Sequence, residues 1–205
     1  METISSNRPK IVVIGSCNTD MVVKANRLPV PGETILGGTF YMNPGGKGAN
    51  QAIAAARLGA EVTFISKIGY DLFGLQALEI YRSEKINTEF IFTDQKSPSG
   101  VALISVDSFG ENSIIVAPGA SRSLSTEDIN KAEEKIKEAD IILMQLEVPI
   151  DTVEYAATIA NRYGKKVILN PAPASTLSNS FLNNVHTILP NRIEAEMPVS
   201  YTHLT

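Results

Sequence analysis

The stretch "NPGGKGANQAIAAARLG" (Asn43–Gly59) joins a glycine-rich turn to an alanine-rich run. Alanine is the strongest helix former, so the run from Gly48 onward predicts a helix, and Gly59 stands where glycine commonly follows a helix C-cap. Glycines ahead of a helix allow the main chain to approach a ligand closely. The stretch therefore predicts a ligand-binding turn or, as the simpler alternative, glycines that only turn the chain.

Two nucleotide-binding motifs fit this turn poorly. A Walker-type phosphate loop needs Ser or Thr after its Gly-Lys, because that hydroxyl binds magnesium, but here Gly48 follows Lys47. A dinucleotide fingerprint directly follows the first strand and ends on a small residue. Gln51 occupies that last position, and the turn lies far downstream of the first apolar run, Ile11–Gly15. The ligand is thus expected to be something other than a nucleotide phosphate.

Outward from the turn, short apolar runs alternate with amphipathic segments. Strands are expected over residues 10–16, 62–69, 141–147 and 165–170, and helices over 48–61, 71–86, 123–140 and 149–164. Asp71 and Ser125 stand at two of the helix starts as N-cap residues. Buried strands that alternate with helices predict an α/β fold, in which a Rossmann-like, mostly parallel sheet is flanked by helices on both faces. One such domain is expected over residues 10–196.

Two segments, roughly residues 20–42 and 100–117, break this alternation. Turn-forming prolines separate two strand-like pieces in the first segment, and the second has two alternating runs around Asp107–Glu111, as in a β-hairpin. Together they predict a small antiparallel sheet that stands apart from the main sheet as a β-lid.

Composition excludes several classes of protein. The chain has 205 residues, of which 43% are hydrophobic, and a formal net charge of −4 without a basic run, so neither nucleic acid nor an anionic membrane is an expected partner. No stretch is long enough to span a bilayer. Cys17 is the only cysteine, which excludes a disulfide framework and a cysteine-based zinc site and favours the cytoplasm.

Polar residues follow the predicted strands. In open parallel sheets ligands bind beyond the carboxyl ends of the strands, so these residues are the candidates: Asn18, Asp20, Glu147, Asn170, Asn191 and Glu194, with Lys47 and Asn50 from the glycine turn. Carboxylates accept hydroxyl protons and amides bridge neighbouring hydroxyls. With bare main chain at Gly45 and Gly46, the set predicts a site for a neutral polyol, such as a sugar.

The motifs resemble one known family over nearly the whole chain. "GSCNTDMV", "PGETILGG", the opening stretch, "LMQLE", "NPAPA" and "PNRIEAE" occur in the order and spacing of the ribokinase family of carbohydrate kinases, from about Lys10 to Glu196. The resemblance implies transfer of the γ-phosphoryl group of ATP to the 5-hydroxyl of D-ribose, with magnesium required and potassium as activator. It also implies a lid that closes over the sugar and packs against a second subunit's lid in a homodimer.

The resemblance assigns roles to individual residues. The sugar would be held by Asn18, Asp20, Gly46, Lys47, Asn50 and Glu147. Asn191 would contact the nucleotide phosphates, and Glu194 would bind magnesium through water. A fructokinase or a nucleoside kinase would share these features, and a non-catalytic sugar-binding module could use the same amides and carboxylates.

Each candidate also has a local explanation. Asp20 could cap a turn, and Lys47 could be a solvated surface lysine. Glu147 could be a carboxylate at a helix N-terminus, while Asn191 and Glu194 match a helix-capping pattern. Asn170 before Pro171 terminates its strand and is left out of the site.

The family's Gly-Ala-Gly-Asp segment, which supplies the catalytic base, does not occur in the sequence. No catalytic residue is therefore assigned, and the chain is expected to lack the nucleotide and potassium sites and to be inactive alone. Met197-Pro198 interrupts the expected last helix. One choice of codons for Pro198–Leu204 gives a DNA sequence that resembles a transposon end used in making sequencing libraries. Residues 197–205 are accordingly expected to be a non-native tail.

Overall fold

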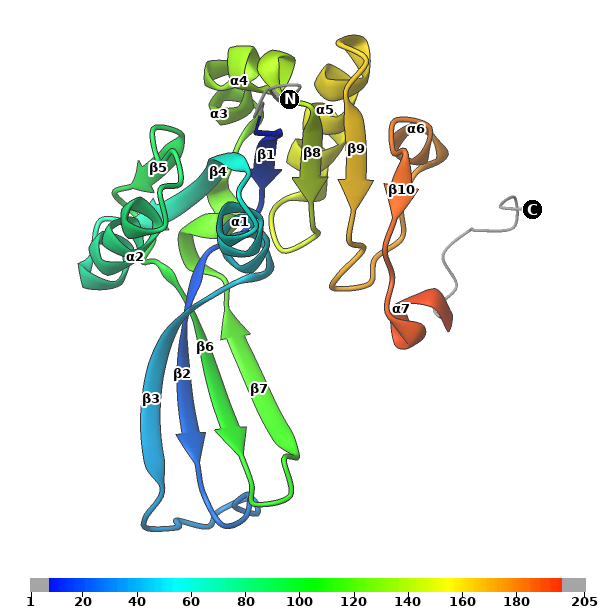
Figure 1. Cartoon of the computed structure of the whole chain (residues 1–205). Coiled ribbons are helices and arrows are strands. Elements are labelled where there is room, and N and C mark those ends of the chain that lie inside the picture. Colours follow the sequence, from blue (N-terminus) through cyan, green and yellow to red (C-terminus); the bar gives the residue numbers. More distant parts are fainter. Residues whose placement is uncertain (1–7, 197–205) are drawn as a thin grey trace, which may run out of the picture.

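The computed structural model describes residues 8–196. The predicted non-native tail, residues 197–205, lies outside the described residues. Two sheets make up the chain (Figure 1). Among the described residues, none of the helices combines the length and apolar character needed to cross a bilayer.

The main sheet is parallel throughout, with the order β10-β9-β8-β1-β4-β5. Its strands are β1 (Lys10–Ile14), β4 (Glu61–Gly69), β5 (Ile91–Asp94), β8 (Ile141–Met144), β9 (Lys166–Leu169) and β10 (Thr187–Ile188). The predicted parallel sheet is confirmed. Strand β5 had no counterpart in the sequence prediction, because its short run, IFTD, is neither clearly alternating nor continuously apolar.

Helices cover both faces of this sheet, since alternate side chains of β1 enter two separate cores. Val12 and Ile14 pack with the helices α3 (Thr126–Lys131), α4 (Glu133–Glu138), α5 (Ile150–Arg162) and α6 (Asn179–Leu182). Val13 lies on the other face, with α1 (Lys47–Arg57) and α2 (Leu72–Ser83). This two-sided burial explains why the central strands are continuous apolar runs.

The second sheet is the predicted lid, with the order β3-β2-β6-β7. Its strands are β2 (Asn18–Lys24), β3 (Thr39–Gly45), β6 (Gly100–Val106) and β7 (Asn112–Ala117). The outer pairs are antiparallel as expected, but the central strands β2 and β6 run parallel. They do so because β2 and β6 both leave the same end of the main sheet. Strand β3 continues to Gly45, so most of the expected turn before the helix is strand.

Several helix boundaries were predicted correctly from capping residues. Asp71 accepts a hydrogen bond from the Gly74 N–H, and Ser125 forms a complete capping box with Asp128. Gly59 and Gly164 follow their helices with positive φ, at 96° and 65°. The helix expected over residues 123–140 is instead two short helices, α3 and α4, which are separated at Ala132, and it is preceded by the 3-10 helix η1 (Gly119–Ser123).

The lid joins the main sheet at the carboxyl ends of its strands (Figure 1). The chain leaves β1 directly into β2, and it returns from β3 directly into α1. At the base of β6, the Asp71 carboxylate accepts hydrogen bonds from the Ser99 N–H and hydroxyl, each at 2.7 Å. The polar residues that follow β1, β3 and β8 are therefore gathered beneath a lid with a firmly held base.

Candidate functional site

Glu147 is held at the point where three distant segments meet. It follows β8, and its Oε2 accepts hydrogen bonds from the Ser16 hydroxyl after β1 and from the Lys47 N–H at 2.9 Å. Lys47 is the first residue of α1, so this carboxylate lies at the positive N-terminus of a helix, where negative charge is stabilised. A carboxylate at a helix N-terminus is the alternative role that the sequence predicts for Glu147. Glu147 does lie at a helix N-terminus, but the helix is α1 and not the one that follows Glu147 in the sequence.

Asp20 lies at the base of the lid, close enough to Glu147 for their charges to interact. A Cβ placed on Gly45 would stand 1.9 Å from Asp20 Oδ1, so the carboxylate packs directly on the bare main chain of β3. Burial raises the pKa of Asp20 above its ordinary value, and the neighbouring Glu147 carboxylate adds to the rise. Two carboxylates are therefore close enough to interact.

Asn18 is the third residue of the group that we call the acidic wall, which consists of Asn18, Asp20 and Glu147. Its side chain is buried against Gly100, whose added Cβ would stand 2.1 Å from Asn18 Oδ1. Among the described residues, Asn18 Oδ1 has no hydrogen-bond partner. A buried polar atom without a partner is costly, and a hydroxyl group of a ligand in the adjoining cavity would satisfy it.

The glycine turn permits this close packing. Gly46 has φ at 90°, and a Cβ there would come within 2.9 Å of Cys17 Cα and Asn18 N. Only glycine combines that φ with such a contact at low cost. The glycine at position 46 therefore allows the start of α1 to pack closely on the residues after β1. It also leaves the main chain of the turn uncovered by a side chain next to the site.

Lys47 and Asn50 lie in the first turn of α1. The Lys47 side chain is half-buried and that of Asn50 is exposed. Within residues 8–196 neither side chain forms a hydrogen bond or an ion pair with another residue. Their polar groups are thus available to a ligand.

A cavity of about 350 Å³ lies beside Glu147, a size suited to a small ligand. Its lining combines Asn18 and Glu147 of the acidic wall with Ser16 and with residues of β7, η1 and the loops after β8 and β9. The full set is Ser16, Asn18, Val116, Pro118, Arg122, Leu146, Glu147 and Pro173. Polar groups on one side and apolar groups on another match a sugar, which presents both hydroxyls and C–H faces.

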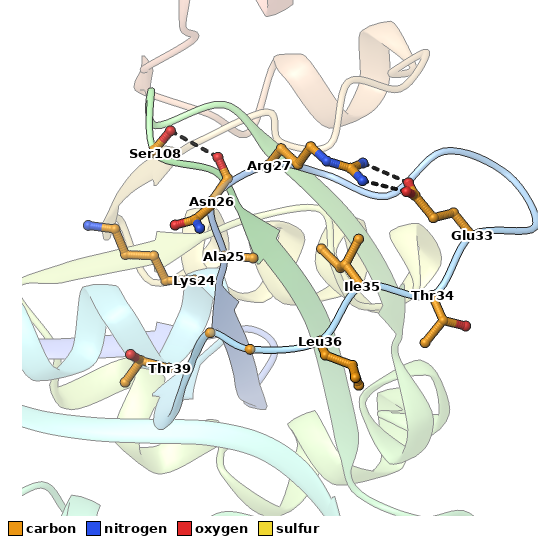
Figure 2. A pocket seen from close by; sticks show the side chains of 12 residues that line it. Lys24, Ala25, Asn26, Arg27, Glu33, Thr34, Ile35, Leu36, Thr39 and Ser108 are labelled. Atoms are coloured by element: carbon orange, nitrogen blue, oxygen red, sulfur yellow. Dashed lines mark hydrogen bonds and ion pairs between the residues drawn. The ribbon is translucent and has the colours of Figure 1, made fainter.

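A larger cavity, of about 550 Å³, lies at the far end of the lid (Figure 2). Its carboxylate, Glu33, already forms an ion pair with Arg27, and Ser108 donates to the Asn26 carbonyl at 2.9 Å. Since its one carboxylate is already paired with Arg27 and the predicted site residues are elsewhere, we place the candidate site at Glu147.

Asn191 and Glu194 are apart from the acidic wall. They follow β10, which is two strands from β8, a spacing of roughly 10 Å along the sheet edge. The Glu194 oxygens accept from the Asn191 N–H and side-chain amide at 2.8 and 2.9 Å, and the Glu194 N–H donates to Asn191 Oδ1 at 2.8 Å. This is the capping arrangement noted from the sequence, and it begins α7 (Arg192–Glu196).

Three contributors were missed by the sequence analysis. Ser16 binds Glu147, Arg122 lines the cavity, and the buried Gln145 donates from Nε2 to Gln51 Oε1. Ser16 and Gln145 follow buried strands, so the rule that selected Asn18 and Glu147 could have found them. Arg122 follows a lid strand, and no sequence signal marked it.

Comparison with known proteins identifies the family of this chain. A family model described as "pfkB family carbohydrate kinase" matches residues 8–202. The chain belongs to this family of carbohydrate kinases. The predicted family resemblance and the predicted α/β fold are thereby confirmed.

Individual relatives narrow the comparison. A ribokinase from Haemophilus influenzae is 45% identical over 190 residues, which cover 93% of this chain and 62% of the relative. A deoxyribokinase from Salmonella typhi is 40% identical over 200 residues, which cover 95% and 65%. The structure of Arabidopsis thaliana ribokinase complexed with ribose and ATP matches with a TM-score of 0.80 and 31% identity, over 91% of this chain and 61% of that one. The chain thus spans less than two thirds of the length of these relatives.

Proposed function

We propose that this chain forms the sugar-binding part of a ribokinase, which transfers the γ-phosphoryl group of ATP to the 5-hydroxyl of D-ribose. The observation that carries the proposal is the Glu147 carboxylate, which is held by Ser16 and the Lys47 N–H beside Asp20 and a cavity of about 350 Å³. The Haemophilus influenzae and Arabidopsis thaliana ribokinases support the choice of sugar.

The residues of the acidic wall would each bind hydroxyl groups. Asp20 and Glu147 accept hydroxyl protons, and Asn18 accepts one through its unpartnered Oδ1. Asn50 and the Lys47 ammonium donate from α1, and the bare main chain at Gly46 lets the sugar lie close to the turn. Because the donors and acceptors come from different elements, the site selects a particular arrangement of hydroxyls.

ATP and magnesium would approach from the β10 side. Asn191 would contact the phosphates, and Glu194 would hold magnesium through water. The geometry fits that role, because Asn191 orients both Glu194 oxygens while each keeps a lone pair for water. The metal would neutralise charge on the transferred group. We propose potassium as an activator without assigning its site to any residue of this chain.

The catalytic base and the adenine pocket are not assigned to the 205 residues, since no Gly-Ala-Gly-Asp segment occurs in them. We therefore expect this chain alone to bind ribose without phosphorylating it. That outcome would also agree with a non-catalytic sugar-binding module, so turnover must be tested in a chain that carries the family's Gly-Ala-Gly-Asp segment.

We also propose a homodimer through the lid and a cytoplasmic location. Val23, Phe40, Met42, Leu103 and Ile115 are exposed apolar residues on one lid face, as their cross-strand register shows. Asp20 and the cavity residue Val116 lie on the other face, as the same register indicates. A second lid would cover the apolar face.

Calorimetric titration of the chain with four ligands tests the function. Ribose is expected to bind more tightly than 2-deoxyribose, fructose or adenosine, because each lost or displaced hydroxyl leaves a buried polar group unpaired. Preferred binding of 2-deoxyribose would instead favour the specificity named for the Salmonella typhi relative. No binding of any of the four would overturn the proposal.

A further inference from the structure

One positively charged side chain that lines the cavity has no role in the proposed sugar binding. Arg122 borders the cavity together with Glu147. Its side chain is exposed, and within residues 8–196 its guanidinium forms no ion pair or hydrogen bond. An unpaired guanidinium at the mouth of a cavity is free to bind a ligand.

The main chain on both sides of Arg122 is firmly anchored. The Ala120 N–H donates to the Pro98 carbonyl at 2.8 Å, and the Lys67 ammonium donates to the Ser123 carbonyl at 3.0 Å. Ser121 is fully buried. The backbone of η1 is thus fixed, and only the Arg122 side chain has to be ordered when a ligand binds.

Half of the residues that line the cavity are apolar. Val116, Pro118, Leu146 and Pro173 supply apolar lining. Apolar surroundings reduce screening, so a charge pair formed here is stronger than one in open water. The carboxylates of the acidic wall suit neutral hydroxyls and repel anions, whereas the Arg122 guanidinium attracts negative charge.

We propose that Arg122 forms an anion-binding subsite that holds a phosphate or carboxylate group attached to a pentose. The inference rests on the proposed sugar-binding function. A guanidinium donates two parallel hydrogen bonds to either group, which favours such oxyanions over a neutral hydroxymethyl group. The oxyanion would come either from the sugar phosphate that the proposed reaction forms or from a sugar acid.

Calorimetry on the 205-residue chain distinguishes these sources. Ribose, ribose 5-phosphate and ribonate are titrated into the wild type, Arg122→Gln and Arg122→Lys, with Arg82→Gln on the surface of α2 as a charge-matched control. Arg122→Gln is expected to weaken binding of at least one anionic ligand about tenfold while ribose affinity changes less than twofold. Arg122→Lys should keep part of the affinity. Added salt should reduce the wild-type advantage for that ligand and leave ribose binding unchanged.

Each outcome bears on the subsite. A selective loss for ribose 5-phosphate identifies the phosphate as its ligand, and a selective loss for ribonate identifies the carboxylate. Equal losses for ribose and the anions, unchanged anion binding, or no anion binding in the wild type would each overturn the inference. If ribose fails to bind while an anion binds through Arg122, the proposed function fails and the subsite stands.

Discussion

Glu147 Oε2 accepts a 2.9 Å hydrogen bond from the main-chain N–H of Lys47, across 100 residues of sequence. The same oxygen accepts from Ser16. Among the described residues, Oε1 has no hydrogen-bond partner and is left for a ligand. One carboxylate therefore joins the ends of β1 and β8 to the start of α1, and the same carboxylate would bind the sugar.

Replacement of this carboxylate should weaken both ribose binding and the stability of the fold. Glu147→Gln keeps the shape but loses the negative charge, so ribose affinity should fall about tenfold or more, and the free energy of unfolding should fall by about 1–2 kcal/mol. Calorimetry and urea unfolding measure the two effects. Glu89→Gln, an exposed site, is the control. Unchanged ribose affinity in Glu147→Gln would remove this residue from the site.

Asp20 should make ribose binding sensitive to pH. Its pKa is raised from 3.8, first by burial and then by Glu147. The folded state therefore favours the protonated form: the charged form costs stability above the raised pKa, and that cost disappears as the pH falls through it. Ribose affinity should fall over the same range, because the bound hydroxyl needs the charged acceptor.

Asp20→Asn separates the two effects. The free energy of unfolding at pH 7 should rise, since the uncharged amide is cheaper to bury, while ribose affinity falls and loses its dependence on Asp20 ionisation. Denaturation and calorimetry at several pH values from about 4 to 7 provide the measurement. A variant that keeps the wild-type pH profile of binding would contradict the assignment.

The glycine turn should tolerate no side chain. Gly46 and Gly59 have similar φ values, 90° and 96°, but a Cβ at Gly46 meets backbone within 3 Å, whereas at Gly59 nothing lies within 4 Å. Gly59→Ala should cost about 1 kcal/mol from φ alone, and Gly46→Ala about 2 kcal/mol more from the contact. Urea unfolding compares them. Equal losses would show that the contact is easily relieved.

The ion pair between Lys67 and Asp128 should stabilise the segment that carries Arg122. Its N–O distance is 2.8 Å, and the side chains are 16% and 7% exposed. Lys67→Met removes the closer and more buried of the two cations that pair with Asp128, leaves only Lys131 at 3.6 Å, and should cost about 3 kcal/mol. Lys135→Met, at an exposed pair with Glu138, should cost less than about 1 kcal/mol. Similar losses in both variants would show that Lys131 or water compensates for the loss of the Lys67 ammonium at Asp128.

The exposed apolar lid face should mediate dimerisation. Leu103 is 53% exposed at the centre of that face. Leu103→Asp should convert a dimer to a monomer in light scattering, because burial of the new charge is unfavourable. Leu58→Asp, at the 90% exposed end of α1, should leave the dimer intact. A monomeric wild type would refute the proposed homodimer.

Local features of the fold could be predicted because their causes lie within a few residues. Asp71 and Ser125 cap helices through neighbouring N–H groups, and Gly59 ends α1 in a conformation that glycine adopts readily. The interruption at Ala132 was not predictable, since the apolar positions continue through it. The parallel pairing of β2 with β6 was also missed, because pairing depends on where both strands leave the main sheet.

The candidate site was predicted in part for a similar reason. The strand-end rule selected Asn18 and Glu147, since parallel strands place their carboxyl ends on one edge. The rule does not predict the order of the strands in the sheet. It therefore could not show that Asn191 and Glu194, which follow β10, lie apart from the acidic wall. Arg122 was not predicted because it follows a strand of the lid and not a strand of the main sheet, so the strand-end rule did not apply to it.

The sequence by itself determined the alternation of strands and helices, the helix caps, the glycine turn and the family, because these depend on residue types at short, regular spacings. Only the tertiary structure decided that the Glu147 carboxylate lies at the N-terminus of α1, that Asp20 packs on Gly45, and that Arg122 borders the same cavity. Such contacts join segments far apart in the chain. They form only when the buried sheet brings the strand ends together.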